Sequence, residues 1–246
     1  MTHVLITGAN GLVARALSRR FPDAVTLTHA QLDITDRDAV FSVARGCLVI
    51  NCAVVGVEES ERDPALAEAV NVRGPALLAE AAERLIHFSS NYVLDPVNVY
   101  ARTKLEGERA IAGRATIVRT SWVFGAEKES FFSTVHRRLR RGERVQATSD
   151  IFACTTWVEH LAARVEEIIG RGDRGLLNVT NEGVCSHEIF AREAARIVGA
   201  DPALIDVVSE ADLRRTPRPR STPIVTDPPL PHWRDALAAY IESADA

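Results

Sequence analysis

Three side chains in the middle of the sequence could together reduce a carbonyl group. Tyr100 and Lys104 are four residues apart, which places them on one face of a helix. A free phenol titrates at about pH 10, and a neighbouring ammonium favours the phenolate, so Lys104 would make Tyr100 a better proton donor. Hydride delivery to a carbonyl carbon needs such a donor at the carbonyl oxygen. Ser90, at the end of the preceding predicted strand, could hydrogen-bond that same oxygen.

Lysine is scarce in this chain, which makes the spacing more informative. Lys104 and Lys128 are the only lysines, and arginine is used elsewhere. A compact ammonium, unlike a guanidinium, suits the binding of a ribose and the tuning of a nearby phenol. A Tyr-x-x-x-Lys pattern also occurs by chance on solvated helix faces. Its position after a glycine-rich turn and a strand ending in Ser-Ser favours a catalytic role.

The glycine-rich turn near the N-terminus predicts a dinucleotide site. An apolar strand at 4–7 runs into Thr-Gly-Ala-Asn-Gly-Leu-Val-Ala at 7–14, a GxxGxxA pattern that opens a helix. Gly8 permits the tight turn, Gly11 lets the backbone approach a pyrophosphate, and Ala14 allows close helix packing. We expect cofactor contacts from Thr7, Gly8, Asn10, Gly11 and Leu12.

The end of the second predicted strand favours NADP(H), with NAD(H) as the alternative. NAD sites usually place an acidic residue there to hold the ribose 2′-hydroxyl. This chain has Thr28 and His29, so no carboxylate would repel a 2′-phosphate, and His29 is a candidate cofactor contact. Arg15, Arg19 and Arg37 could approach the phosphate.

The elements that must position these residues alternate between strand and helix. We predict strands at 4–7, 24–27, 48–52, 85–89 and 116–119, and helices at 12–21, from Thr35, at 64–83 and at 100–112. This alternation predicts an α/β fold with a Rossmann-type, doubly wound parallel sheet. Glu58, Glu59 and Glu61 fall in a predicted polar loop after the third strand.

The regular alternation of predicted strands and helices ends after Val123, which predicts a small C-terminal substrate-binding lobe. Residues 1–124, rejoined by about 155–180, would form the dinucleotide-binding domain, and 125–154 with 181–246 the lobe. The predicted elements of the lobe are a basic helix at 136–141 and a helix at 186–198. The segment that rejoins the dinucleotide-binding domain has a predicted helix at 158–170 and a predicted strand at 176–179. We interpret the arginines of the basic run as a solvated helix face.

Composition excludes several classes of function. A formal charge of -4 over 246 residues offers no global attraction to nucleic acid or anionic membranes. The chain has no transmembrane-length apolar run and no signal-peptide pattern. Its four cysteines show no metal-binding spacing, so we expect free thiols, no metal and a cytoplasmic location. The four are Cys47, Cys52, Cys154 and Cys185.

These motifs resemble those of the extended short-chain dehydrogenase/reductases, closest to the dTDP-4-dehydrorhamnose reductases and related sugar-nucleotide 4-ketoreductases. The resemblance covers nearly the whole chain. Its motifs include Leu32-Asp33-Ile34-Thr35-Asp36, Val49-Ile50-Asn51-Cys52-Ala53, Val70-Asn71, Ser89-Ser90-Asn91-Tyr92, and Arg119-Thr120-Ser121-Trp122-Val123-Phe124-Gly125.

The resemblance implies an NADPH-dependent ketoreductase acting on a nucleotide-linked deoxysugar or a related carbonyl. It implies that Asp33 and Ile34 lie near the adenine and that Trp122 and Val123 border the nicotinamide and the sugar. Further cofactor contacts are implied for Cys52, Ala53, Val54 and Asn71, and substrate contacts for Ser90, Asn91, Ser130 and Arg218. Arg214, Arg215, Arg218 and Arg220 stand in a proline-rich tail where a phosphate-binding and a structural role are both open.

The chain departs from the family pattern around the predicted substrate. The Ser-Thr-Asp-Tyr stretch reads Ser89-Ser90-Asn91-Tyr92, and the segment between it and Asn98 is short. Two alternatives therefore remain beside the ketoreductase. One is a non-catalytic NADP-binding regulatory subunit of the same fold, and the other is a sugar-nucleotide epimerase or dehydratase. The partner we expect is a small molecule, and a homodimer is compatible with the sequence.

Overall fold

The computed structural model describes residues 3–213 and 216–245, which form two compact units. The first unit comprises the described residues up to Arg119 together with Ala162–Leu177. The second comprises Thr120–Leu161 and the described residues from Asn178 onward. Among residues 3–213 and 216–245, no helix combines the length and the apolar character that a transmembrane span needs.

The first unit is built on a six-stranded, mostly parallel sheet with the order β2-β1-β3-β4-β5-β9. Its order reverses beside β1, as in a doubly wound fold, so the predicted Rossmann-type α/β class is confirmed. The strands are β1 (His3–Thr7), β2 (Val25–Leu27), β3 (Cys47–Asn51), β4 (Arg84–Ser90), β5 (Thr116–Thr120) and β9 (Gly175–Asn178).

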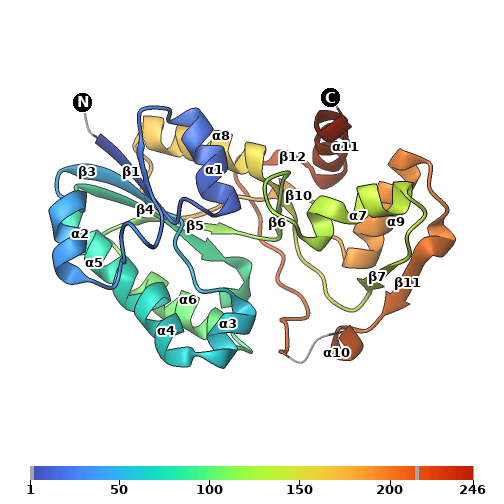
Figure 1. The fold of residues 1–246 in the computed structure, drawn as a ribbon, viewed down its shortest axis with the longest axis horizontal. Helices are drawn as coiled ribbons and strands as arrows, with labels where there is room; N and C mark the ends of the chain where they lie inside the picture. Colours follow the sequence, from blue (N-terminus) through green and yellow to red (C-terminus); the bar gives the residue numbers. More distant parts are fainter. Residues whose placement is uncertain (1–2, 214–215, 246) are drawn as a thin grey trace. The chain divides into compact units, whose positions relative to one another are not determined.

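Helices cover both faces of this sheet, with α1 and α8 on one side and α2, α5 and α6 on the other (Figure 1). Their bounds are α1 (Leu12–Arg20), α2 (Arg37–Ala44), α5 (Gly74–Ala81), α6 (Val99–Ile111) and α8 (Val158–Arg171). The apolar faces of α2, α5 and α6 pack on apolar strand residues, and Leu5, Val49, Leu85, Leu78 and Ile111 belong to one buried cluster.

Two local predictions in this unit were wrong, and a third differs in detail. The second helix begins at Arg37 instead of Thr35, because the Asp36 carboxylate caps it by accepting a hydrogen bond from Ala39 N. The polar loop after β3 is helix α3 (Val57–Arg62). The predicted helix at 64–83 is present as α4 (Pro64–Glu68), a π-helical turn at Ala69–Arg73 and α5, which follow one another directly.

The second unit combines helices with three two-stranded sheets, β6–β8, β7–β11 and β10–β12. Its strands are β6 (Val123–Phe124), β7 (Val145–Thr148), β8 (Thr156–Trp157), β10 (Asn181–Glu182), β11 (Ile205–Val208) and β12 (Leu230–His232). Its helices are α7 (Phe131–Arg140), α9 (His187–Val198), α10 (Glu210–Leu213) and α11 (Trp233–Asp245), with 3-10 turns at Pro202–Leu204 here and at Asn91–Leu94 in the first unit.

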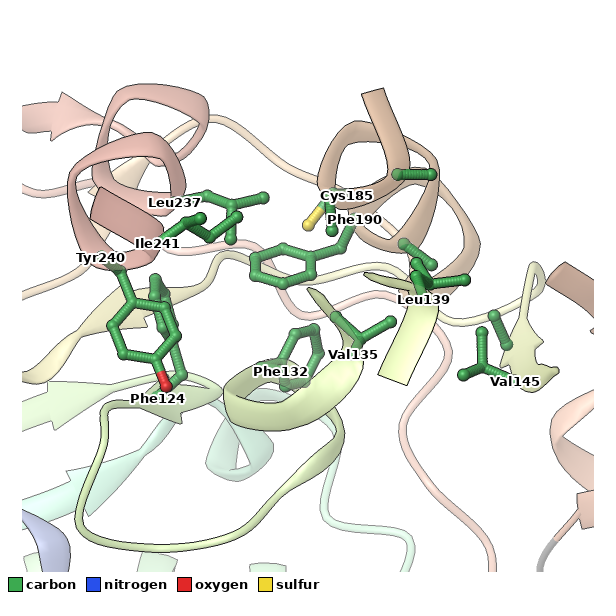
Figure 2. Packing of buried hydrophobic residues seen from close by; sticks show 14 of the residues in the cluster. Phe124, Phe132, Val135, Leu139, Val145, Cys185, Phe190, Leu237, Tyr240 and Ile241 are labelled. Atoms are coloured by element: carbon green, nitrogen blue, oxygen red, sulfur yellow. The ribbon is translucent and has the colours of Figure 1, made fainter. Parts of the chain in front are cut away.

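An aromatic core holds the second unit together. Phe190 of α9 lies between Phe132 of α7 and the side chains of α11, with ring centroids 4.9 Å from Phe132 and 5.6 Å from Trp233 (Figure 2). The predicted basic helix at 136–141 belongs to the longer α7, which starts after the capping residue Ser130. It buries Phe132, Val135 and Leu139 and leaves its arginines on the other side, as the solvated-face interpretation requires.

Candidate active site

A row of three polar side chains crosses neighbouring strands near their carboxyl ends. Thr7 of β1 is in register with Asn51 of β3, and Asn51 is in register with His87 of β4. In-register residues of parallel strands point to one face of the sheet, and here they are joined by hydrogen bonds. Thr7 Oγ1 donates to Asn51 Oδ1 at 2.6 Å, and Asn51 Nδ2 lies 3.0 Å from His87 Nδ1. All three are buried.

Lys104 continues this row from helix α6. Its Nζ lies 3.1 Å from His87 Nε2 and donates to Phe88 O at 2.6 Å. The residue is 2% exposed, and this burial lowers the pKa of the amine to about 8, against the attraction of Glu108. Burial and the nearby Lys104 charge hold the pKa of His87 well below its ordinary value, so the imidazole is neutral.

Tyr100 and Ser90 lie beside this row. Asn98 caps α6 by accepting from Ala101 N at 2.8 Å, which fixes the helix start just before Tyr100. Burial raises the pKa of Tyr100 to about 12, and a hydrogen bond with Ser90 partly offsets the rise. This direction is opposite to the lowering by Lys104 that the sequence led us to expect. The phenol therefore keeps its proton throughout the neutral range and can act as an acid.

Ser90 and Asn91 form the junction between β4 and the following 3-10 turn. Ser90 Oγ accepts from Tyr92 N at 3.2 Å and lies 3.4 Å from Asn91 Oδ1. Tyr92 also places its ring edge-on to Tyr100, with centroids 6.0 Å apart. These contacts hold the Ser90 hydroxyl beside the phenol despite the short segment that leads from the turn to Asn98.

The glycine turn has the geometry that a dinucleotide pyrophosphate needs. Gly8 has φ +69°, and a Cβ there would lie 2.7 Å from Ala53 N and 2.8 Å from Cys52 C. Gly11 is the N-cap residue of α1, and no side chain caps that helix end. Its first-turn N–H groups are therefore not bound by a capping side chain and can receive a phosphate. These residues fit the predicted cofactor.

The end of β2 contributes no carboxylate. Thr28 is bound through its N and Oγ1 to Gln31 Oε1, and His29 is exposed. The Asp33 carboxylate accepts hydrogen bonds from Thr35 N and Oγ1, which lower its pKa. Arg37 is engaged elsewhere, since it forms a bidentate ion pair with Glu80. It is thus not freely available to bind a cofactor phosphate.

The other predicted cofactor residues differ in accessibility. Val54 is 50% exposed, and Cys52 and Ala53 are half-buried. Ile34 is buried, and its side chain is within 3 Å of where a Cβ on Gly74 would lie. Asn71 is buried in the π-helical turn. Its Oδ1 accepts from Val55 N, and its Nδ2 donates to Val55 O and to Thr103 Oγ1. The Asn71 side chain therefore supports the loop after β3.

The remaining predicted residues belong to the second unit. Trp122 has φ +36°, an uncommon conformation for a non-glycine residue, and its ring stacks on Phe132 at 5.0 Å. Val123 pairs with Thr156 between β6 and β8. The Ser130 hydroxyl caps α7 by accepting from Ser133 N.

The proline-rich tail reaches a cavity of about 470 Å³ in this unit. Arg218 and Arg220 line it together with Asp150 and Glu210. The Arg218 guanidinium also lies 3.5 Å from Thr216 O. Arg214 and Arg215 fall outside the described residues, so the structure describes two of the four tail arginines.

Sequence reasoning missed several residues of the site. Asn51, at the end of an apolar strand, was noticed only as part of a family motif, and His87, in the middle of β4, was not singled out. Glu108, one helical turn beyond Lys104, is buried and accepts two hydrogen bonds from Arg119 at 2.8 and 2.6 Å. An i, i+4 spacing from Lys104 was the available signal for Glu108.

The parallel sheet and the uncapped glycine turn define a Rossmann-type dinucleotide-binding protein. A family profile described as the RmlD substrate binding domain matches residues 1–245, so the chain belongs to this family.

Similar proteins agree with this assignment. The dTDP-4-dehydrorhamnose reductase of Mycobacterium tuberculosis is 37% identical over 97% of this chain and 92% of its own length. The crystal structure of a dTDP-4-dehydrorhamnose reductase from Clostridium acetobutylicum superposes with a TM-score of 0.91 at 26% identity over all of both chains. That of the Bacillus anthracis enzyme in complex with NADP has a TM-score of 0.87 at 25% identity, over 99% of this chain and all of that one.

Proposed function

We propose that this protein is an NADPH-dependent ketoreductase that reduces a keto group on a dTDP-linked deoxysugar. The observation that carries the proposal is the constellation of Ser90, Tyr100 and Lys104, with Ser90 and Lys104 buried, at the carboxyl end of a dinucleotide-binding sheet. The names of the relatives support the same reaction and substrate class.

The reaction needs a proton at the carbonyl oxygen while a hydride reaches the carbonyl carbon. NADPH supplies the hydride when bound. Tyr100 supplies the proton, because burial keeps its phenol protonated until about pH 12. The Ser90 hydroxyl, which already hydrogen-bonds with the phenol, orients the carbonyl oxygen toward Tyr100. Lys104 restores the proton of Tyr100 after the reduction.

The first compact unit is the cofactor domain in this proposal. The uncapped N-terminus of α1 binds the pyrophosphate, and Gly8 keeps the turn close to Ala53. The end of β2 offers Thr28 and His29, so a 2′-phosphate meets no carboxylate at these positions. NADPH is accordingly preferred to NADH.

The second compact unit is the substrate lobe in this proposal. We assign the sugar contact to Trp122, which combines an unusual backbone conformation with a ring stacked on Phe132. Arg218 is the residue we expect to bind the diphosphate of the substrate, because it lines the cavity that the proline-rich tail reaches. Asn91 and Ser130 complete the predicted set.

The setting of the enzyme follows from the same proposal. We infer a cytoplasmic location, where NADPH and sugar nucleotides are formed, and the four cysteines are free as a reducing compartment requires. Pairing of two copies into a homodimer is compatible with the sequence. Size-exclusion chromatography with light scattering tests the pairing, and a mass of 26.9 kDa would contradict it.

Two measurements test the proposed function. Titration of the nicotinamide fluorescence should give tight binding of NADPH and weak binding of NADH. The absorbance of NADPH should then fall when a dTDP-linked 4-keto-6-deoxysugar is added. Tight NADPH binding without turnover would reject the reductase and favour the regulatory subunit. Binding of neither nucleotide would reject both.

A further inference from the structure

The hydrogen bonds around Lys104 have directions that restrict its protonation. The row Thr7–Asn51–His87–Lys104 is buried along its whole length, so its donors and acceptors must satisfy one another. The backbone groups in this neighbourhood have fixed hydrogen-bonding roles, and one of them orients the row. Ala53 N–H can only donate, and it lies 3.1 Å from Asn51 Oδ1.

The Ala53 amide orients the Asn51 side chain. Since Oδ1 of Asn51 must accept from Ala53 N–H, the Nδ2 group of Asn51 faces His87 and donates to Nδ1 at 3.0 Å. A neutral imidazole has one N–H and one acceptor nitrogen. The proton of His87 is therefore on Nε2.

The Nε2–H group of His87 meets Lys104 Nζ at 3.1 Å. An ammonium group has three donors and no acceptor, so two donors would face each other there. The neutral amine has a lone pair that accepts from His87, and it still donates to Phe88 O. Turning the Asn51 amide round does not remove the conflict, because its Nδ2 would then face Ala53 N–H.

We propose that His87, oriented by Asn51, is a positioning residue that stabilises the neutral amine of Lys104 and makes Lys104 a proton carrier instead of a fixed cation. This inference rests on the proposed reductase function. After Tyr100 has given its proton to the substrate oxygen, Lys104 in its ammonium form gives one proton to the phenolate. The resulting amine accepts the Nε2–H of His87, and solvent returns one proton to Lys104 for the next cycle.

The other groups that face Lys104 do not replace it in this role. Glu108 on the next turn of α6 favours the ammonium, but its carboxylate is shared with Arg119 of β5. Burial raises the pKa of the Cys52 thiol, and burial raises that of Tyr100 to about 12. His87 stays neutral. Lys104 is thus the member of this group that exchanges a proton near neutral pH, in agreement with its pKa of about 8.

The sequence makes a direct test practical, because Lys104 and Lys128 are the only lysines. Protein labelled with lysine-ε-¹³C gives two signals, and Lys128→Arg assigns them. Lys104 should titrate at least one pH unit below the ordinary lysine value of about 10.4. In His87→Gln, a side-chain carbonyl can turn to accept from an ammonium, so the midpoint of Lys104 should rise by about one pH unit, a tenfold change in its proton affinity.

A matched control is available in the second unit. His160 Nδ1 lies 2.8 Å from Asn181 Nδ2, so it repeats the Asn–His pair in the other compact unit. His160→Gln should leave the Lys104 midpoint unchanged. The inference is overturned if Lys104 titrates at the ordinary lysine value, or if folded His87→Gln leaves the Lys104 midpoint where it was.

A second measurement covers the case in which His87→Gln does not fold. The ¹⁵N shifts of His87 in the unaltered protein should report the Nε2–H tautomer, and the Nδ1–H tautomer would overturn the inference. Both experiments use protein without cofactor or substrate. Absent turnover with the expected titration would therefore reject the reductase and leave this proton arrangement standing.

Discussion

Replacing Gly8 by alanine should damage both folding stability and cofactor binding. The left-handed φ of +69° costs an L-residue about 1–2 kcal/mol. The new Cβ would also lie 2.7 Å from Ala53 N and 2.8 Å from Cys52 C, and both are backbone atoms at the exit of β3. Relieving such a clash by shifting the backbone costs about 1–3 kcal/mol more. We expect the free energy of unfolding to fall by about 2–5 kcal/mol in total.

Gly46 provides the matched control for this substitution. It has φ +72°, but a Cβ there would meet nothing within 4 Å. The free energy of unfolding of Gly46→Ala should therefore fall only by the cost of the left-handed backbone conformation, about 1–2 kcal/mol. Urea denaturation of both variants separates the clash from the backbone cost.

The same pair of variants tests the cofactor site. Moving Gly8 disturbs the hydrogen bonds Gly11 N–H to Gly8 O at 2.9 Å and Ala9 N–H to Leu27 O at 3.1 Å. Fluorescence titration should show NADPH affinity reduced about tenfold or more in Gly8→Ala, a loss of about 1.4 kcal/mol, and unchanged in Gly46→Ala. If the two variants bind NADPH equally and are equally stable, the close approach of Gly8 to Ala53 is not what the site requires.

Three further predictions concern the groups around the phenol. Tyr100→Phe should keep the fold by circular dichroism and lower kcat by about 10²–10⁴-fold, and undiminished turnover would remove Tyr100 as the acid. Lys104 has its pKa lowered from 10.5 to about 8, so the folded protein holds fewer protons than the unfolded chain between those pH values. The stability of the wild type relative to Lys104→Met should therefore rise by about 3 kcal/mol as pH increases through this window, and a flat difference in urea titrations would contradict the burial of the charge. Arg119→Leu should destabilise the protein by about 3–5 kcal/mol by leaving Glu108 buried and unpaired, and the double variant with Glu108→Leu should recover much of that loss.

The parts of the fold that depend on local pattern could be predicted from the sequence. The sheet strands follow apolar runs, and the glycine turn follows from three small residues at fixed spacing. Helix boundaries that depend on side-chain caps were less accurate, as Asp36 shows. The π-helical turn within the predicted helix at 64–83 contains Asn71, which binds the backbone of Val55, a contact between residues 16 apart that no periodicity reveals.

The residues that helix α6 contributes to the candidate site could be predicted from the sequence, but those that the strands contribute could not. Tyr100 and Lys104 are visible because one helical turn separates them. Thr7, Asn51 and His87 come together only through strand register, over sequence separations of 44 and 36 residues. The pKa of Tyr100 was expected in the wrong direction because burial, which dominates it, is a property of the packed protein.

The most direct test of the central claim follows the hydride itself. The protein is incubated with NADPH carrying deuterium at the transferable position and with a dTDP-linked 4-keto-6-deoxysugar, and the sugar product is analysed by mass spectrometry and NMR. We predict an alcohol with deuterium on the former carbonyl carbon, formed by the wild type and lost in Tyr100→Phe. A product without deuterium, or unreacted keto sugar beside bound NADPH, would contradict the assignment of this protein as a reductase.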